Sequence, residues 1–313
     1  PVARKTPSKS SKQKSEALRV AGIRITNADR VLYKPEGVTK GEVAKYWEAV
    51  ADAALPHLAD RPLTLVRCPT GPAGQCFFQK HWGQGMPETV PRVAIDESDG
   101  TAPYMYIDGL PALISLVQFG VLEVHVFNCR RDRLDRPDQM IFDLDPDEAL
   151  PWREVVDAAV MLREWLAALE LQSFVKTTGG KGLHVVLPLA RRAGWDVVRE
   201  FAHGVALQFV KAEPDRFTAT MSKRTRKGRI FIDYLRNAFN ATAIAPYSPR
   251  ARGGAPVSVP IGWEEVEAMK DRPSFDVRSV PKRVQGLRRD PWDGFFRVRQ
   301  SISSAMRKAV GAH

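Results

Sequence analysis

Apolar and polar residues alternate along this chain with two different periods, which predict the order of its helices and strands. Within residues 40–55, Val43, Trp47, Val50 and Ala54 recur at the spacing of one helix face. The same spacing predicts helices over residues 111–120, 152–169, 195–210 and 294–310. Strands are predicted over residues 63–67, 122–127, 140–144, 174–176, 183–187 and 229–235. This mixture predicts an α+β (mixed α/β) fold, with a mixed β-sheet flanked by helices and a smaller N-terminal module.

The composition changes along the chain and divides it into segments. Residues 1–20 are rich in Lys, Ser and Pro, so we expect a disordered basic linker, of the kind found where a domain is cut from a longer polypeptide. We predict the N-terminal module over about 21–110 and the main core over about 111–265. A helical extension follows to about residue 300, and residues 301–313 form a C-terminal tail.

Several classes of protein are disfavoured by the composition. No run of about 18 uncharged apolar residues is present, so we expect no membrane span, and the N-terminus lacks the apolar stretch of a secretory signal. The three cysteines, Cys68, Cys76 and Cys129, form an odd set without a CxxC pair. This pattern argues against a disulfide framework and against a zinc knuckle, and it fits a reducing cytosol.

Positive charge is concentrated in a few segments. Of the formal net charge of +11, residues 1–19 contribute +5 and the remaining 294 residues contribute +6. Within the predicted folded part, basic residues cluster at 130–136, 223–229 and 282–289. A solvated loop would explain any one cluster, but several together favour a polyanionic partner such as DNA or RNA.

Asp143 and Asp145 are the first candidates for chemistry. They lie in the apolar segment Ile141–Pro146, where alternation along a strand would place both carboxylates on one face, about 6–7 Å apart. Such a pair repels unless a cation lies between the two, and hard oxygen ligands suit Mg²⁺ or Mn²⁺. Two bound ions can activate a 3′-hydroxyl and stabilise leaving pyrophosphate. A solvated strand end is the alternative, because this triplet is common.

Asp233 is the second candidate, within the apolar segment Phe231–Leu235. An acid on a core strand needs a partner, because burying an unpaired carboxylate is costly. Arg236 could supply that partner, and a third metal-ligand role fits this segment equally well.

A glycine-rich turn over residues 177–182 is the third candidate. Its glycines expose backbone N–H groups to an anion, and Lys181 and His184 add positive charge or hydrogen-bond donors. The Walker A ending is absent, and ordinary hairpin turns look similar. His184, followed by three apolar residues, could equally be a half-buried strand histidine.

The order of these motifs is similar to that of a known family. The chain resembles the archaeo-eukaryotic primase superfamily, and more closely the polymerase domain of bacterial ATP-dependent DNA ligase D. Three motifs carry this resemblance: Asp143-Leu144-Asp145, Thr178–His184 and 226–233 with Asp233. It extends through residues 27–33, 41–47, 77–80 and 245–250, and so covers roughly residues 22–265. It implies a primase-like catalytic core in place of a generic mixed sheet.

The resemblance also implies roles for individual residues. Asp143, Asp145 and Asp233 would bind two ions, Mn²⁺ or Mg²⁺. The incoming nucleoside triphosphate would contact Thr178, Lys181, His184, Arg250 and His125. Phe77 and Phe78 would stack on a template base, although packing into the core, with one ring inward and one outward, is the alternative. Arg30 and Lys40 would grip a 5′-phosphate across a gap, and would otherwise be solvated cations.

The function that follows is a primer-extending polymerase acting in bacterial non-homologous end joining. It would add templated and non-templated nucleotides, preferably ribonucleotides, at gaps and broken ends of duplex DNA. The implied partners are Ku and covalently linked ligase and nuclease/phosphoesterase domains, around a monomer in the bacterial cytoplasm. A DxD glycosyltransferase, a non-catalytic DNA-end-binding module and a replicative primase are the alternatives.

Overall fold

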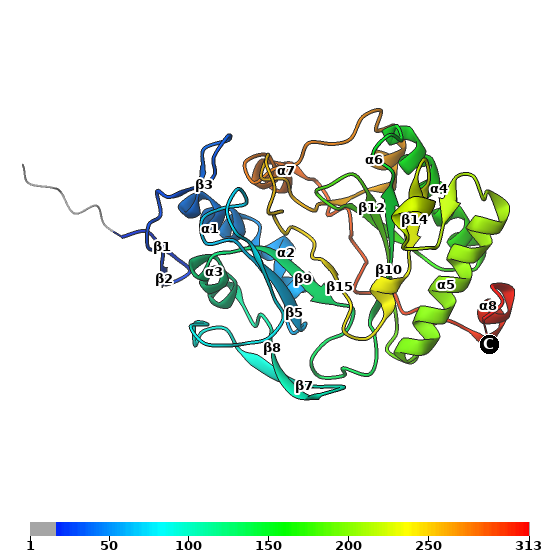
Figure 1. Ribbon diagram of the computed structural model, residues 1–313, viewed down its shortest axis with the longest axis horizontal. Coiled ribbons are helices and arrows are strands. Elements are labelled where there is room, and N and C mark those ends of the chain that lie inside the picture. The colour runs from blue at the N-terminus through cyan, green and yellow to red at the C-terminus, as the bar shows by residue number, and fades with distance from the viewer. Residues whose placement is uncertain (1–16, 313) are drawn as a thin grey trace, which may run out of the picture.

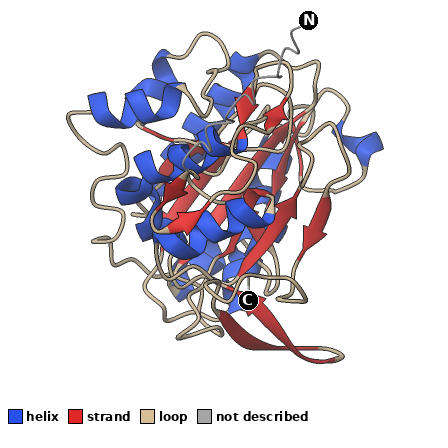
Figure 2. Cartoon of the chain, turned by 90° about the vertical axis from the view of Figure 1, so that its left-hand side faces the viewer, coloured by secondary structure: helices blue, strands red, loops and turns tan. Residues whose placement is uncertain are grey.

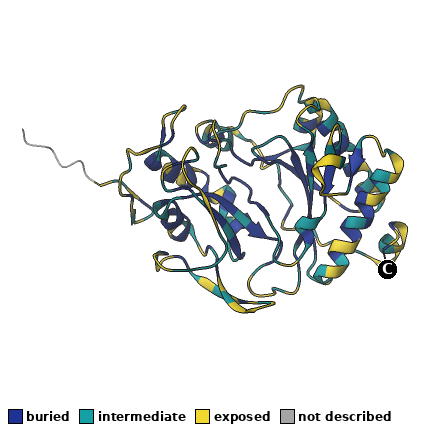
Figure 3. Ribbon diagram, viewed as in Figure 1, coloured by how far each residue is buried: buried dark blue, intermediate teal, exposed yellow. Residues whose placement is uncertain are grey.

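The computed structural model describes residues 17–312 and contains two larger β-sheets that lie side by side (Figure 1). The strands form the interior and most helices lie around them, while one hairpin extends from the lower edge (Figure 2). The strands of both sheets are mostly buried, and exposed residues gather on the hairpin and the outer helices (Figure 3). The mixed α/β fold predicted from the sequence is confirmed.

The first sheet has four antiparallel strands in the order β15-β9-β5-β6. They are β5 (Leu63–Arg67), β6 (Phe77–Gln79), β9 (Val121–Phe127) and β15 (Thr242–Ile244). Helices α1 (Lys40–Ala49), α2 (Ala51–Leu58) and α3 (Leu110–Phe119) accompany this sheet. Strand β9 pairs with β5, and β15 pairs with β9. The sheet therefore combines strands from both sides of residue 110, where the predicted N-terminal module ends.

Three two-stranded sheets complete the N-terminal half. They are β1 (Arg19–Val20) with β2 (Ile23–Arg24), β3 (Val31–Tyr33) with β4 (Val38–Thr39), and β7 (Arg92–Glu97) with β8 (Gly100–Met105). The β7–β8 pair is the extended hairpin of Figures 1 and 2. The sequence pattern did not predict these short strands. Disorder was expected over residues 1–20. Residues 1–16 lie outside the described residues, and the expectation is wrong for the end of this range, because β1 begins at Arg19.

The second sheet has six strands in the order β13-β14-β10-β12-β11-β16. They are β10 (Gln139–Pro146), β11 (Phe174–Thr177), β12 (Leu183–Pro188), β13 (Phe217–Thr218), β14 (Ile230–Asp233) and β16 (Pro260–Ile261). Only β13 and β14 run parallel. The strand was predicted over residues 140–144, but β10 extends to Pro146, because Asp145 and Pro146 still pair with Phe231 and Ile230 on β14.

Alternation along these strands gives the six-stranded sheet two different faces. Met140, Phe142 and Leu144 belong to the main apolar cluster, together with the buried face of helix α4. Helices α4 (Trp152–Ala168) and α5 (Trp195–Ala212) cover this side (Figure 1). Ile141, which precedes Asp143 by two residues, instead belongs to a separate small cluster with Trp292 and Phe295. The aspartates of β10 therefore point away from α4 and α5.

The C-terminal region differs from its prediction. It contains α6 (Trp263–Ala268), α7 (Ser279–Gly286) and α8 (Ser304–Ala309), so the continuous helix expected over 294–310 is wrong for its first half. Gly294 has a left-handed φ of +90°, and Trp292 and Phe295 pack against Ile141 and Phe174 instead of lining a helix face. The amide of Gln300 donates to the carbonyls of Gln172 and Pro188, which ties this segment to the ends of β11 and β12.

Cys68 and Cys76 form a disulfide bond, which contradicts the expectation of free thiols. The expectation failed because the chain reverses between β5 and β6 and brings the two Cα atoms within 4.4 Å, which cysteine spacing alone did not reveal. Cys129 is buried and free.

The helix predicted over 40–55 is confirmed, with a break at Val50 between α1 and α2. No helix within residues 17–312 is long and apolar enough to span a membrane.

Candidate active site

A row of four titratable side chains, all buried or mostly buried, crosses the face of the six-stranded sheet that lies opposite α4 and α5. Lys176 on β11 pairs in register with His184 on β12, His184 pairs with Asp143 on β10, and Asp143 pairs with Asp233 on β14. Residues directly opposite each other on neighbouring strands share a face, so all four side chains point to the same side. The sequence predicted three of these residues as site residues, and the pairing explains how they meet.

Asp143 is mostly buried and ionised in this row. Burial by itself raises the pKa of Asp143, but the nearby His184, Arg236 and Lys176 outweigh it and hold the pKa well below its ordinary value. Nε2 of His184 lies 3.4 Å from Oδ1 of Asp143. Burial and the neighbouring Lys176 lower the pKa of His184 to about 4, so its ring is neutral at neutral pH.

Lys176 was not recognised from the sequence. Its ammonium group is buried and donates to the hydroxyl of Ser258 at 2.7 Å, and Ser258 donates in turn to the carbonyl of Thr177. Burial lowers the pKa of Lys176 strongly, while Asp143 opposes that shift. Lys176 thus lies directly opposite His184 on the neighbouring strand, two residues before Thr178, which follows the end of β11.

Asp233 shares one cationic partner with Asp143. Nε of Arg236 lies 3.2 Å from Oδ2 of Asp233 and 3.4 Å from Oδ2 of Asp143, while Oδ1 of Asp233 accepts the N–H of Leu235. Burial raises the pKa of Asp233; Arg236 opposes this, and the nearby Asp143 adds to it. The arginine partner considered from the sequence is therefore present, and it bridges two carboxylates.

Asp145 is more exposed and is held by two other cations. Nη1 of Arg226 lies 3.0 Å from Oδ2 of Asp145, and Nζ of Lys181 lies 3.5 Å from Oδ1. The guanidinium of Arg226 also covers the ring of Phe231, at 3.9 Å from its centroid. All three carboxylates therefore already have cationic partners from the chain itself.

The glycine-rich turn has a conformation that two of its glycines make possible. Gly179 has a φ of +66°, and a Cβ there would lie 2.7 Å from Cγ of Arg250. A Cβ at Gly182 would lie 2.2 Å from the carbonyl oxygen of Leu144 on β10. The hydroxyl of Thr178 closes the turn, donating to the carbonyl of Gly182 and accepting the N–H of Gly180. The turn is thus pressed against the end of β10, beside Asp145.

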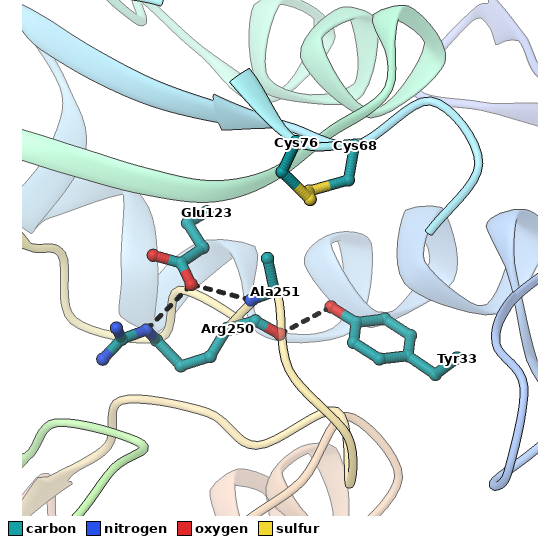
Figure 4. The surroundings of a disulfide bond; sticks show 6 residues. All are labelled: Tyr33, Cys68, Cys76, Glu123, Arg250 and Ala251. Atoms are coloured by element: carbon teal, nitrogen blue, oxygen red, sulfur yellow. Dashed lines mark hydrogen bonds and ion pairs between the residues drawn. A yellow bond between two sulfur atoms is a disulfide. The ribbon is translucent and has the colours of Figure 1, made fainter. Parts of the chain in front are cut away.

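His125 and Arg250 both contact Glu123, a residue that the sequence analysis did not select. Figure 4 shows the contacts of Glu123 with Arg250 and Ala251. Glu123 accepts from Nε of Arg250 at 3.0 Å and from the N–H of Ala251 at 2.7 Å, and its other oxygen lies 2.8 Å from Nε2 of His125. Burial raises the pKa of Glu123, but His125 and Arg250 outweigh it and hold that pKa at about 2. Burial lowers the pKa of His125 against the opposing effect of Glu123.

Most predicted site residues line one pocket of about 230 Å³ between the two sheets. Those that line it are His125, Asp143, Asp145, Thr178, Lys181, His184 and Arg250. Arg236, Thr242 and Arg252 line it as well. Asp233 adjoins it through its pairing with Asp143. The structure therefore brings together residues that are more than a hundred positions apart in the sequence.

Phe77 and Phe78 lie on β6, at the edge of the four-stranded sheet and outside this pocket. Their side chains are both at the surface, Phe77 with 45% of its area exposed and Phe78 with 82%. The alternative that one ring packs into the core is therefore wrong. Two exposed aromatic rings in succession are an unusual use of apolar surface, and the stacking role stays a prediction.

Arg30 and Lys40 lie in the N-terminal half and differ in how many hydrogen bonds their side chains make within the chain. Nη1 of Arg30 donates to the carbonyl of Pro69 in the disulfide loop at 3.2 Å. Lys40 is 9% exposed, and its ammonium donates to the carbonyl of Thr26 and to both the carbonyl and the side chain of Gln118. Burial and the charge of Arg30 lower the pKa of Lys40. Their role at a 5′-phosphate stays a prediction.

The carboxylates of Asp143, Asp145 and Asp233 are suitable ligands for a divalent cation. Across residues 17–312, no group of three or more His, Cys, Asp or Glu side chains is arranged to hold a metal ion as it stands. However, the carboxylates of Asp143 and Asp233 already flank a single cationic nitrogen of Arg236, and Asp145 lies two residues along the same strand face. Hard carboxylate oxygens in this arrangement suit Mg²⁺ or Mn²⁺ if Arg236 moves aside.

Comparison with known proteins identifies the family. A family model described as "LigD, primase-polymerase domain" matches residues 39–292. The multifunctional non-homologous end joining protein LigD of Pseudomonas aeruginosa is 40% identical over 292 residues, which are 93% of this chain and 35% of that protein. LigD of Mycolicibacterium smegmatis is 37% identical over 246 residues, 78% of this chain and 32% of that protein.

A solved structure supports the same family. The polymerase domain from Mycobacterium tuberculosis ligase D, in complex with DNA, matches with a TM-score of 0.79 and 32% identity, over 84% of this chain and 94% of that one. The family model and the solved relative together identify the chain as a primase-polymerase type of nucleotidyltransferase domain. The chain belongs to the family of LigD primase-polymerase domains. It spans about a third of the length of the two curated relatives, and its family replaces the glycosyltransferase alternative.

Proposed function

We propose that this chain is the polymerase domain of a LigD protein and extends primers by metal-dependent nucleotidyl transfer. It acts at gaps and broken ends of duplex DNA in bacterial non-homologous end joining, adding templated and non-templated nucleotides and preferring ribonucleotides. The family and the name of the Pseudomonas relative support the repair context, and the solved relative was determined with DNA. The observation that carries the proposal is the register of Asp143 with Asp233, with Asp145 on the same face.

Asp143, Asp145 and Asp233 would hold two divalent ions, Mn²⁺ or Mg²⁺. When bound, these ions would supply Lewis-acid stabilisation of phosphate charge and lower the pKa of a 3′-hydroxyl. The low pKa of Asp143 keeps its carboxylate ionised at neutral pH and therefore ready to ligate. His184, neutral and buried beside it, holds this carboxylate in place.

The remaining pocket residues would bind the incoming nucleoside triphosphate. Lys181 in the glycine turn and Arg250, which donates to the carbonyl of Thr178, both line the pocket and provide positive charge for an anion. Thr178 and His125 complete the wall that would contact the sugar or the phosphates. This placement of cations would neutralise developing charge and exclude bulk water around the α-phosphate.

The proposed DNA contacts lie on the four-stranded half of the molecule. Phe77 and Phe78 would stack on a template base, and Arg30, with Lys40 behind it, would bind a downstream 5′-phosphate. Lys40 would have to exchange at least one of its internal hydrogen bonds to do so. Ku and the ligase and nuclease/phosphoesterase domains of the longer protein would be the partners in the cell.

Primer extension on a gapped duplex tests the proposal. Wild-type protein should extend the primer only with Mn²⁺ or Mg²⁺, more efficiently with a downstream 5′-phosphate and with ribonucleotides. The variants Asp143→Ala and Asp145→Ala should abolish extension while DNA binding largely survives. Full activity in either variant would contradict the metal mechanism, and metal-independent DNA binding without extension by the wild type would indicate the non-catalytic end-binding module.

A further inference from the structure

We infer that Glu123 is a positioning residue for nucleotide binding. Its carboxylate contacts both His125 and Arg250, and it holds their side chains where they line the pocket that also contains Asp143. This inference rests on the proposed function, in that it assigns the pocket of His125 and Arg250 to a nucleotide. Neither the family match nor the motifs single out Glu123.

The contacts of Glu123 connect separate segments of the chain. From β9, its carboxylate accepts two hydrogen bonds from the segment after β15, one from Nε of Arg250 and one from the N–H of Ala251. Nη1 of the same Arg250 then donates to the carbonyl of Thr178 at 2.7 Å, in the glycine turn of the six-stranded sheet. Figure 4 shows Glu123 facing Arg250, with the hydroxyl of Tyr33 holding the backbone carbonyl of Arg250 from the other side. Glu123 therefore sets the position of Arg250 between the two sheets.

The second oxygen of Glu123 orients His125. A carboxylate only accepts hydrogen bonds, so a neutral His125 must carry its proton on Nε2 to donate across the 2.8 Å separation. That tautomer leaves Nδ1 without a proton, as an acceptor. An orienting carboxylate behind a functional histidine is a recurring way of fixing a ring and its tautomer.

Burial makes this arrangement depend on the charge of Glu123. Its side chain is 9% exposed, so the carboxylate is stabilised by His125, Arg250 and Ala251 more than by water. The amide of Gln has nearly the same shape but only one accepting oxygen. A Gln at this position could keep the hydrogen bond from Ala251 through its single oxygen. It would then lack the negative charge that holds Arg250, and it would turn its N–H₂ group toward His125.

The variants Glu123→Gln and Glu123→Asp test this inference, with Glu265→Gln as the matched control. Glu265 also joins an arginine, Arg283, to a backbone N–H, that of Gly262, but it lies on α6 outside the pocket. Four quantities are measured: affinity for a fluorescent ribonucleoside triphosphate with Mn²⁺ and no DNA, affinity for gapped duplex, steady-state KM and kcat for nucleotide, and Tm.

We expect Glu123→Gln to weaken nucleotide affinity by about 10- to 100-fold, the range typical of orienting carboxylates, and to raise KM more than it lowers kcat. Duplex affinity should stay within about twofold, and Glu123→Asp should recover part of the loss because it keeps the charge. Glu265→Gln should bind nucleotide like the wild type. If Glu123→Gln does not fold, Glu123→Asp is judged by the same pattern, a loss of nucleotide affinity with unchanged duplex affinity.

Wild-type nucleotide affinity in Glu123→Gln would overturn the inference. So would a parallel fall of nucleotide affinity, duplex affinity and Tm, which would make Glu123 a purely structural residue, or a wild-type chain that binds no nucleotide. Nucleotide binding without DNA involves no bond formation, so this measurement can succeed or fail independently of primer extension, which tests the proposed function. A wild type that binds nucleotide but never extends a primer would refute the polymerase proposal and leave the role of Glu123 intact.

Discussion

The two halves of this molecule present their functional candidates in opposite ways. On the six-stranded sheet, Asp143, Asp233 and His184 are mostly buried, occupy fixed register positions and have partners within the chain. On the four-stranded sheet, Phe77 and Phe78 stand at the surface on an edge strand. Buried charges that are already paired resist displacement, whereas exposed rings can adapt to different bases.

This difference matches what each half would have to do. Nucleotidyl transfer needs ligands held in place before the substrate arrives, because poorly oriented groups lose most of their effect. A gap or a broken end varies in sequence and geometry, so its reader benefits from sequence-tolerant stacking. Changes in the row should therefore affect chemistry strongly with the fold preserved, and changes near β6 should affect stability or DNA binding more modestly.

The largest effect is expected for Asp233→Asn. The Asn side chain keeps an oxygen to accept the N–H of Leu235 but removes the charge opposite Asp143. We expect primer extension to fall on the order of 10³-fold or more, because metal ligation is worth several kcal/mol of transition-state stabilisation. Tm should stay the same or rise slightly, since burial and Asp143 already disfavour the ionised form of Asp233. Extension rates and thermal melting of the purified variant measure both.

Asp52→Asn is the control for that substitution. Asp52 is exposed on α2 and lies outside the pocket, so extension should be unchanged. If Asp233→Asn extended primers within about tenfold of the wild-type rate, Asp233 would not be a metal ligand. The register of Asp143 with Asp233 would then no longer support a metal site.

The sequence predicted the parts of the site that depend on local periodicity. Asp143 and Asp145 fall on one face because strand alternation is a local property. The same rule applied to residues 122–127 would have found Glu123, which is two positions before His125. The pairing of Asp143 with both His184 and Asp233 could not be predicted from this periodicity, because register is set by packing between distant strands.

Two errors in the sequence analysis have the same physical origin. The spacing of apolar residues after Gly294 is typical of a helix, yet Phe295 stacks on the ring of Trp292, and both pack on the face of the six-stranded sheet. Tertiary packing overrode the local preference. Likewise, Cys68 and Cys76 meet only because β5 and β6 pair, so their spacing carried no signal of a disulfide.

The next effect is expected from opening that disulfide. Closing a loop with a sequence separation of 8 should stabilise the fold by about 2–3 kcal/mol in the chain-entropy description. We therefore expect Cys76→Ser to lower the free energy of unfolding by that amount, and wild-type protein with reductant to behave in the same way. Urea unfolding with and without reductant measures it, and Cys76→Ser is the control for the reductant itself, because without the disulfide its two curves should coincide. Identical wild-type curves in both conditions would show that the bond does not stabilise the fold.

The smallest effect is expected for Phe78→Ala, which tests the exposed half directly. Its ring is 82% exposed, so removing it should leave Tm almost unchanged. If the ring stacks on a base, affinity for gapped duplex should fall by about 1–2 kcal/mol, roughly 5- to 30-fold, in the lower part of the stacking range because Phe77 remains. Nucleotide affinity without DNA should be unaffected, since Phe78 lies outside the pocket. Leu207→Ala, an exposed apolar residue on α5, is the control. Unchanged duplex affinity in Phe78→Ala would remove the stacking platform from the proposal and leave the row on the six-stranded sheet as its main support.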